Sequence, residues 1–195
     1  MDGTGAVGVR VRPMRPEDAA EVGRLTLASY DAYGFIGGAY REELGDPLPR
    51  IGGAAAVLVA ELDGRVVGTV TYVLPGDEQW EGRPTPEGDC GFRVLAVDPS
   101  AEGNGVGRHL VEHCLERARA DGRHRLVITT MEWMTRAHAL YDRLGFVRRP
   151  DLDVRFPSGV GFIYTRDVTA EAASRFPAPG PVPAEPPWYE DVWVR

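Results

Sequence analysis

The most constraining feature of this chain is the segment Val94–Arg119, where an apolar run leads through closely spaced glycines into a helical pattern. The glycines are Gly103, Gly105 and Gly107, one at every second position. Apolar residues then recur at helical spacing and define one buried face: Val106, Leu110, Val111, Cys114, Leu115 and Ala118. A strand that passes through a glycine turn into an amphipathic helix predicts a domain in which helices pack on a sheet.

The glycine spacing indicates what this turn can bind. It matches neither the dinucleotide fingerprint GxGxxG nor the P-loop GxxxxGK[ST]. A backbone without Cβ atoms at a helix N-terminus can still approach a phosphate or pyrophosphate, because the first amides of a helix are unpaired and the helix dipole favours an anion. The alternative is a glycine-rich connection that binds nothing.

The remaining patterns predict an α/β chain of the α+β type with a mixed sheet covered by helices. Strands are expected at Val9–Met14, Ala54–Leu62, Arg65–Leu74, Gly91–Val97, Arg125–Met131, Phe146–Arg149 and Val160–Asp167. Helices are expected from Pro16 onward and over Ala39–Leu44, Gly105–Ala120 and Thr135–Leu144. Asp63-Gly64 predicts a tight hairpin, whereas Gly45–Gly53 and Pro75–Asp89 have the composition of loops.

Length and composition predict one folded domain with two extensions. A chain of 195 residues is long enough for one sizeable core, which we expect over residues 9–168. Residues 1–8 are expected to be a flexible N-terminus, and residues 169–195 a proline-rich tail. The tail ends in the aromatic residues Trp188, Tyr189 and Trp193, which predict docking on the body or on a neighbouring subunit.

Charge and hydropathy narrow the function classes. A net charge of −7 argues against general binding to nucleic acid or anionic membranes and mildly favours cationic substrates. The longest apolar stretch, Ala54–Ala60, is far shorter than a membrane span, and Met1–Gly8 lacks the features of a secretion signal. These features predict a cytoplasmic protein.

The cysteines and histidines do not predict a metal site. Cys90 and Cys114 form no CxxC motif; Cys114 belongs to the buried helix face, and a reactive Cys90 is the alternative left open. His109, Glu112 and His113 match the pattern H-x-x-E-H of some zinc peptidases, but they share the side opposite the apolar face and no third ligand is evident. We therefore expect a solvated helix face here and no metal.

Two segments resemble the motifs of a known family, the GNAT N-acetyltransferases. "LAVDPSAEGNGVG", Leu95–Gly107, resembles the family's strand and its (Arg/Gln)-x-x-Gly-x-(Gly/Ala) loop, and "TRAHALYDRLGF", Thr135–Phe146, resembles a second motif. The resemblance covers roughly Val9–Val168. It implies the GNAT fold, a central mixed and mostly antiparallel sheet covered by helices on both faces. It also implies acetyl-CoA as co-substrate and transfer of acetyl to a small-molecule or peptide amine in a ternary complex. A non-catalytic acyl-CoA-binding or regulatory module is the alternative, and a homodimer is left open.

The resemblance also implies roles for individual residues. The amides that would bind pyrophosphate are those of Gly103, Asn104, Gly105, Val106, Gly107 and Arg108. The backbone of Leu95, Ala96 and Val97 would pair with the pantetheine arm, and Thr135 is a further cofactor contact. Tyr141 matches the tyrosine that protonates the departing thiolate. Glu102 and Met134 depart from the family pattern, which has Arg or Gln and often Asn at these positions.

The chemistry of amine acylation also requires a base, because an alkyl ammonium of pKa ~10 must lose a proton before its nitrogen attacks. Asp89 is the first candidate and Glu132 the second, with solvated surface acids as the alternative for both. The adenosine 3′-phosphate needs a cation, and the candidates are Arg108, Arg136, Arg143, Arg148 and Arg149, with Arg108 best positioned. Acceptor recognition is expected from the segments Tyr30–Ile51 and Pro75–Asp89.

Overall fold

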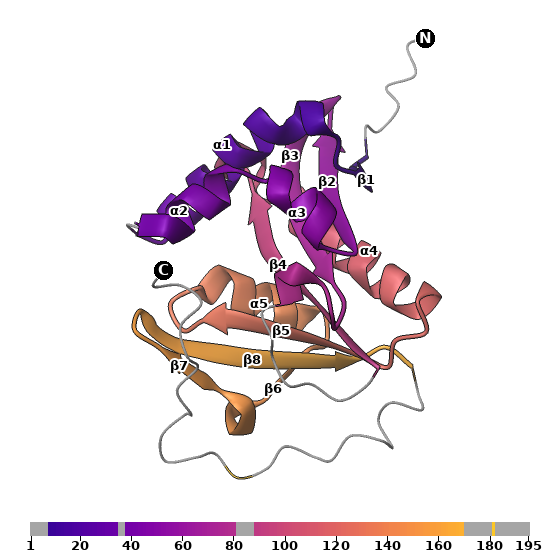
Figure 1. Ribbon diagram of the computed structural model, residues 1–195, viewed down its shortest axis with the longest axis vertical. Helices are drawn as coiled ribbons and strands as arrows, with labels where there is room; N and C mark the ends of the chain where they lie inside the picture. Colours follow the sequence, from indigo (N-terminus) through magenta and orange to yellow (C-terminus); the bar gives the residue numbers. More distant parts are fainter. Residues whose placement is uncertain (1–7, 35–37, 81–87, 170–180, 182–195) are drawn as a thin grey trace.

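The computed structural model describes residues 8–34, 38–80, 88–169 and 181 (Figure 1). The predicted N-terminus 1–8 and tail 169–195, including Trp188, Tyr189 and Trp193, lie outside the described residues except for Gly8, Thr169 and Pro181. Both extensions therefore stay predictions.

The strands and helices of the described chain follow the predicted order, with one additional helix, α3, and one additional strand, β7. The strands are β1 (Arg10–Pro13), β2 (Ala56–Leu62), β3 (Arg65–Val73), β4 (Asp89–Val97), β5 (Arg125–Met131), β6 (Val147–Arg148), β7 (Val154–Phe156) and β8 (Gly159–Asp167). The α-helices are α1 (Ala19–Asp31), α2 (Gly38–Gly45), α3 (Leu48–Gly53), α4 (Val106–Ala120) and α5 (Thr135–Arg143). Four 3-10 turns accompany them: η1 (Pro16–Asp18), η2 (Glu78–Trp80), η3 (Pro99–Ala101) and η4 (Pro150–Leu152).

The strands form one mixed, mostly antiparallel sheet in the order β1-β2-β3-β4-β5-β8-β6, with β7 paired to β8. Of the pairings among the described residues, the one between β4 and β5 is parallel and the others are antiparallel. The predicted hairpin between β2 and β3 is confirmed, since Asp63 and Gly64 both have positive φ, 52° and 75°.

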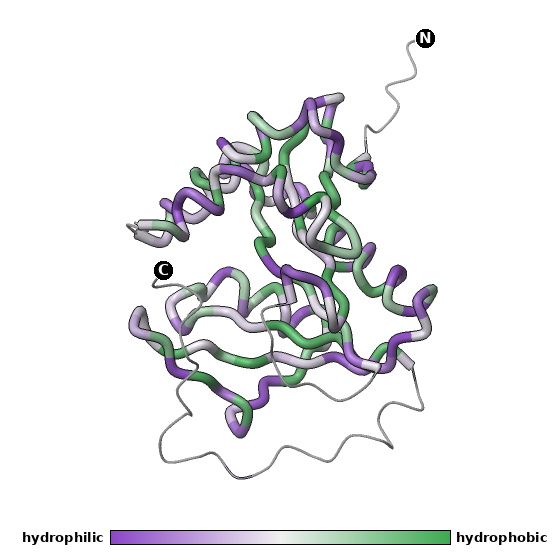
Figure 2. Tube along the Cα trace, in the orientation of Figure 1, coloured by the Kyte–Doolittle hydropathy of each residue, from purple (hydrophilic) through white to green (hydrophobic). Residues whose placement is uncertain are grey.

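Helices cover both faces of this sheet, as the sequence predicts. Val57 and Val59 of β2 pack with Met14 and Val22 on the side of α1. Leu58 and Ala60, the alternating residues of the same strand, belong to the main core with the apolar face of α4. Because both faces are covered, the strand is a continuous apolar run, and Figure 2 shows hydrophobic residues along the central strands.

The parallel pair β4–β5 is short, and the two strands then diverge. Pairing joins Asp89–Gly91 to Arg125–Val127, after which β4 continues beside β3 while β5 continues beside β8 (Figure 1). Within the diverging part of β4, Val94 has a φ of 49°, and the register against β3 shifts at this point. Positive φ is strained for a β-branched residue, so Val94 marks a β-bulge that turns the strand away from β5.

Three elements differ from the sequence prediction. Leu48–Gly53 is helical although its glycines and prolines indicate a loop, because proline is tolerated in the first turn of a helix. The expected loop after β3 contains η2, whose Trp80 is buried. Strand β7 was not predicted; it is three residues long and forms a hairpin with β8. None of the helices in the described part of the chain is long and apolar enough to span a membrane.

Candidate active site

The glycine loop before α4 has the backbone that the sequence suggests. Gly103 and Gly105 both have positive φ, 84° and 75°, a region that other residues rarely adopt, and Gly105 is the N-cap of the helix. The side chain of Asn104 donates to the carbonyls of Ala101 and Glu102, at 3.1 and 3.4 Å, and so holds the loop from behind. The loop therefore presents its main chain, and no large side chain, in front of the helix.

The amides of this loop are available to a ligand. The backbone amide of His109 donates to the carbonyl of Gly105 at 3.0 Å and makes the first hydrogen bond of the helix. For the six amides of Gly103–Arg108, no acceptor is present among the described residues. Unpaired amides at the positive end of a 15-residue helix form an anion-binding site.

A groove of about 720 Å³ lies in front of the loop, between α1, α4 and α5. Its charged lining residues are Arg108, Arg136, Arg143, Arg166, Glu102 and Glu112. Arg136 donates to Glu102 and Arg108 to Glu112, each at 2.8 Å. Four guanidinium groups against two carboxylates make this groove basic within an acidic protein, which suits a polyanionic ligand.

A second, smaller cavity of about 70 Å³ lies where β4 and β5 diverge. The residues that line it are Ser29 and Tyr30 of α1, Tyr33 just after α1, Phe92–Leu95 of β4, Ile128–Thr130 of β5, and Met134, Ala137 and Tyr141. Ser29, Tyr33, Leu95 and Ala137 line both the cavity and the groove. The two spaces therefore adjoin, and a long ligand in the groove can extend between the strands.

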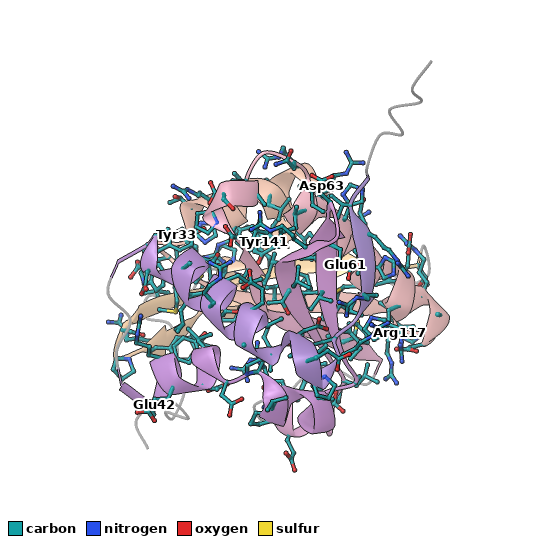
Figure 3. The ribbon with its side chains drawn as sticks, turned by 90° about the horizontal axis from the view of Figure 1, so that it is seen from above. Tyr33, Glu42, Glu61, Asp63, Arg117 and Tyr141 are labelled. Atoms are coloured by element: carbon teal, nitrogen blue, oxygen red, sulfur yellow. The ribbon has the colours of Figure 1, made fainter. Side chains whose placement is uncertain are left out.

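Tyr141 lies at the wall of this cavity and is 4% exposed. Its ring packs against Phe92, Phe146 and Tyr164, with ring centres 5.6 to 5.9 Å apart. Figure 3 shows Tyr141 near Tyr33 at the end of α1, away from Arg117 at the far end of α4. Burial raises the pKa of the Tyr141 phenol, so the side chain is a protonated hydrogen-bond donor at neutral pH.

Most of the predicted cofactor contacts lie along the groove. Its lining includes Leu95, Val97, Gly103, Gly105, Val106, Gly107 and Arg108. The side chain of Ala96 is buried in the core, and the amide of Val97 donates to Ser29 at 3.4 Å. Thr135 is exposed at the start of α5 and lines neither space, and Asn104 contributes only its backbone.

The structure does not bring the two predicted bases to the site. Asp89 is fully buried at the opposite end of β4, where Arg125 donates to both of its carboxylate oxygens at 3.2 and 2.8 Å. Glu132 is exposed at the end of β5 and accepts from the amide of Val160 at 3.1 Å. Neither lines the groove or the cavity, so neither is in place to accept a proton from a substrate there.

Two of the arginines predicted to bind the 3′-phosphate do not line the groove. Arg148 pairs with Asp153 and stacks on the ring of Phe162, and Arg149 is buried against Asp151. Arg108, Arg136 and Arg143 do line the groove. Arg166 of β8 joins them; no sequence motif indicated it, because strand pairing alone carries it there.

The cysteines and the H-x-x-E-H segment have no catalytic arrangement. Cys90 and Cys114 are fully buried, and burial raises the pKa of the Cys90 thiol to about 12, so the alternative of a reactive Cys90 is wrong. The Nδ1 atom of His109 is 2.9 Å from the carbonyl of Gly105, and His113 lies beside Glu116. In the described part of the chain no cluster of histidine, cysteine and acidic residues could hold a metal ion.

Sequence reasoning missed several residues that line the cavity. Ser29 and Tyr30 lie in the last turn of α1, Tyr33 lies in the turn that follows, and Arg93 lies in the middle of β4. Tyr30 falls in the segment expected to recognise the acceptor, but nothing in the sequence singled it out. Only the divergence of β4 from β5 brings these residues together.

Fold and site together define a class of protein in which a parallel strand pair opens beside a glycine-rich helix N-terminus. Such an arrangement can hold an extended anionic ligand with its reactive end between the strands. The profile of the acetyltransferase (GNAT) family matches residues 26–146, and the chain belongs to this family.

Individual relatives agree with this assignment. A mycothiol acetyltransferase from Cellulomonas flavigena is 40% identical over 96 residues, 48% of this chain, and the chain spans only 27% of that protein's length. The structure of a GNAT family N-acetyltransferase from Escherichia coli in complex with CoA is 25% identical, with a TM-score of 0.63, and the match covers 88% of each chain. A GNAT family acetyltransferase from Brucella melitensis in complex with acetyl-CoA is 26% identical, with a TM-score of 0.52 over 72% of this chain and 84% of that one.

Proposed function

We propose that this protein transfers an acetyl group from acetyl-CoA to a primary amine by direct transfer in a ternary complex. The observation that carries the proposal is the divergence of β4 from β5, which leaves a cavity with Tyr141 at its wall and joins it to the basic groove. Family membership and the two relatives solved with CoA or acetyl-CoA support it.

The residues present fit such a co-substrate. When bound, acetyl-CoA supplies the acetyl thioester. The free amides of Gly103–Arg108 hold the pyrophosphate, and the arginines of the groove neutralise further phosphate charge. The exposed edge of β4 at Leu95 and Val97 pairs with the amide groups of the pantetheine arm, because this part of β4 has no β5 partner.

Tyr141 gives its proton to the departing thiolate. Its pKa is raised by burial, so the phenol keeps its proton until a stronger base forms beside it. Proton transfer by a positioned group contributes roughly 10²–10⁴-fold to a rate. The ring packing described above holds the side chain in place without help from solvent.

The absence of a suitable nucleophile among the described residues supports direct transfer. A covalent acetyl-enzyme requires an activated thiolate or hydroxyl next to a base. Cys90 and Cys114 are buried outside the cavity, and among the described residues that line it there is no carboxylate or imidazole. In the proposed mechanism the acceptor amine attacks the thioester itself, after it has released its proton to solvent.

Turnover with an amine panel tests the proposal. The full-length protein should release CoA from acetyl-CoA in the presence of an acceptor, and mass spectrometry should find the amine heavier by one acetyl group. Initial rates that vary both substrates should give intersecting lines, as a ternary complex requires. Tight CoA binding without turnover on any amine would support the non-catalytic module instead.

A further inference from the structure

Arg50 of α3 is a buried cation that has no ion-pair partner among the described residues. It is 1% exposed, and it heads the fully buried side chains of the molecule by size. Its Nε, Nη1 and Nη2 atoms have no hydrogen-bond partner in the part of the chain that the structure describes. An arginine stays protonated in proteins, so a complete guanidinium charge lies in the interior, and no described residue accepts a hydrogen bond from it. Such a group is costly for the free protein and calls for an explanation.

The surroundings of Arg50 belong to the acceptor side of the site. The groups whose charges act on its guanidinium are Tyr30, Arg93, Glu43 and Tyr40. Tyr30 and Arg93 line the cavity between β4 and β5, and Tyr30 packs edge to face on Tyr40 with ring centres 6.2 Å apart. Arg50 therefore lies close behind the wall of the cavity that faces α1 and α2.

The two arginines of this cluster differ in their contacts with the described residues. Arg93 donates to Glu43 at 3.0 Å and to Gln79 at 3.1 Å. Arg50, in contrast, has no hydrogen-bond partner among the described residues. Glu43 is the more exposed member of its pair, with 37% of its side chain accessible against 14% for Arg93. A buried positive charge beside a cavity is complementary to a negative group that enters from outside.

We propose that Arg50 and Arg93 form an anion-binding subsite, so that the acceptor is an amine that also carries a carboxylate or phosphate group. This inference rests on the proposed function, because it assigns the acceptor of that same site. Arg93 lines the cavity and contacts the anion, while Arg50 supplies the charge that Glu43 removes from Arg93. In surroundings shielded from water this charge acts more strongly than it would on the surface. The acceptor is then a zwitterion when it carries a carboxylate and a net anion when it carries a phosphate, although the protein's net charge of −7 taken alone favours a cationic one.

The test compares acceptors that share an amine and differ in the anion, with Arg50→Met as the main variant. The pairs are 2-phenylethylamine with phenylalanine, and ethanolamine with O-phosphoethanolamine, so that the arms separate carboxylate from phosphate. We expect the wild type to prefer one anionic member by about 10-fold or more in kcat/KM. Arg50→Met should lower kcat/KM for that acceptor by about 30-fold, mainly through KM, and change the uncharged amines by less than about 3-fold.

The matched control is Arg41→Met. Arg41 lies on the neighbouring helix α2 and pairs at the surface with Asp31 at 2.5 Å. It removes the same charge from the same side of the molecule, but from outside the cluster around Arg50. We expect it to keep the preference of the wild type. An equal loss in both variants would overturn the proposal, because a general change in surface charge would then explain the effect.

Thermal unfolding gives a readout that does not depend on turnover. Arg50→Met removes a buried charge. Its Tm without ligand should therefore either equal that of the wild type or be higher by about 2–4 °C. The probe is the anionic product matching the preferred acceptor, N-acetylphenylalanine or N-acetyl-O-phosphoethanolamine, and its uncharged counterpart is the control. The probe should raise the Tm of the wild type and not that of the variant.

These outcomes separate the inference from the function on which it rests. Absence of turnover on every amine would refute the proposed function, while an anion-dependent Tm shift that Arg50→Met abolishes would still support the subsite. A Tm well below the wild type for both Arg50→Met and Arg50→Lys, with the acceptor preference intact, would show that Arg50 is structural. Arg93→Gln gives the second variant: it too must lose the preference for the anionic member.

Discussion

Buried arginines lie in opposite situations beside the start and beside the middle of strand β4. At its start, Arg125 of β5 is buried with Asp89 and donates to both carboxylate oxygens. Toward the middle of the strand, beyond the point where β5 diverges, Arg50 is buried beside Arg93 and has no hydrogen-bond partner among the described residues. The first arrangement closes the parallel pair, and the second leaves a charge unmatched at the edge of a cavity. The same residue type therefore serves the fold at the start of the strand and, as we propose, a ligand near its middle.

This comparison also explains why the cavity forms where it does. The Asp89–Arg125 pair fixes the first residues of β4 and β5 side by side, as the register Asp89↔Arg125 shows. Beyond Gly91 each strand follows its antiparallel neighbour, and the bulge at Val94 turns β4 further away. Because the sheet twists, two strands held at one end and bonded to different partners at the other must separate.

The largest effect should come from breaking the paired end. Arg125→Met leaves the buried carboxylate of Asp89 without a cation, and we expect unfolding free energy to fall by about 3–5 kcal/mol at neutral pH. Denaturant unfolding measures this loss. A buried carboxyl without a cation favours its neutral form, so the variant should regain stability as the pH falls toward the pKa of an unfolded aspartate.

The double variant Arg125→Met with Asp89→Asn controls for packing. It should recover part of the loss, because no unpaired charge remains. If Arg125→Met and Arg50→Met changed the unfolding free energy equally and in the same direction, the contrast between the two ends would be wrong.

The second prediction concerns Tyr141 at the diverging end. Tyr141→Phe keeps the ring packing and removes the proton donor, so we expect kcat to fall by about 10²-fold or more with little change in the Kd for CoA. Steady-state rates and calorimetry measure the two quantities. Since burial raises the pKa of Tyr141, the wild type should show no fall in activity from loss of this proton between about pH 7 and 10.

Tyr164→Phe is the matched control for this prediction. Tyr164 of β8 packs on Tyr141 with ring centres 5.7 Å apart, and it does not line the cavity. Its substitution removes a hydroxyl from the same aromatic cluster without removing the proposed acid. A comparable loss of kcat in both variants would show that the cluster, and not the Tyr141 proton, supports turnover.

How far the sequence predicts the molecule differs between the two sides of the cavity. The cofactor side rests on backbone geometry, and glycine spacing such as Gly103-x-Gly105 reports backbone geometry directly. The acceptor side depends on Arg50 and Arg93, which lie far apart in the chain in segments without a recognisable motif. It also depends on the direction in which a buried side chain points, which the sequence does not report. The prediction of Asp89 as a base failed because the sequence does not report which side chains lie next to each other in the fold. Nothing in the sequence shows that Arg125 lies beside it.

The third prediction tests whether the glycine loop acts through its backbone. Gly105→Ala places a side chain at a φ of 75°, and we expect a loss of about 1 kcal/mol in stability and about a 10-fold weaker Kd for CoA, because the loop must move its amides to relieve the strain. Gly122→Ala, at a φ of 65° just beyond the other end of α4, should cost similar stability and leave the Kd unchanged. Equal Kd values for the two variants would remove the loop from the binding site.

The smallest effect is expected at the rim of the groove, where Glu102 stands at the position that the family pattern assigns to Arg or Gln. Its carboxylate accepts from Arg136 at 2.8 Å, and both side chains are about half exposed. Glu102→Gln removes the negative charge and leaves Arg136 free to face a phosphate, so the Kd for CoA should tighten by up to about 5-fold at low salt. The gain should shrink as salt screens the charges. Glu116→Gln removes the same charge from the exposed side of α4, outside the groove, and should not tighten binding. If both variants tightened it equally, the effect would come from net charge alone, and Arg136 would have no part in holding the phosphates.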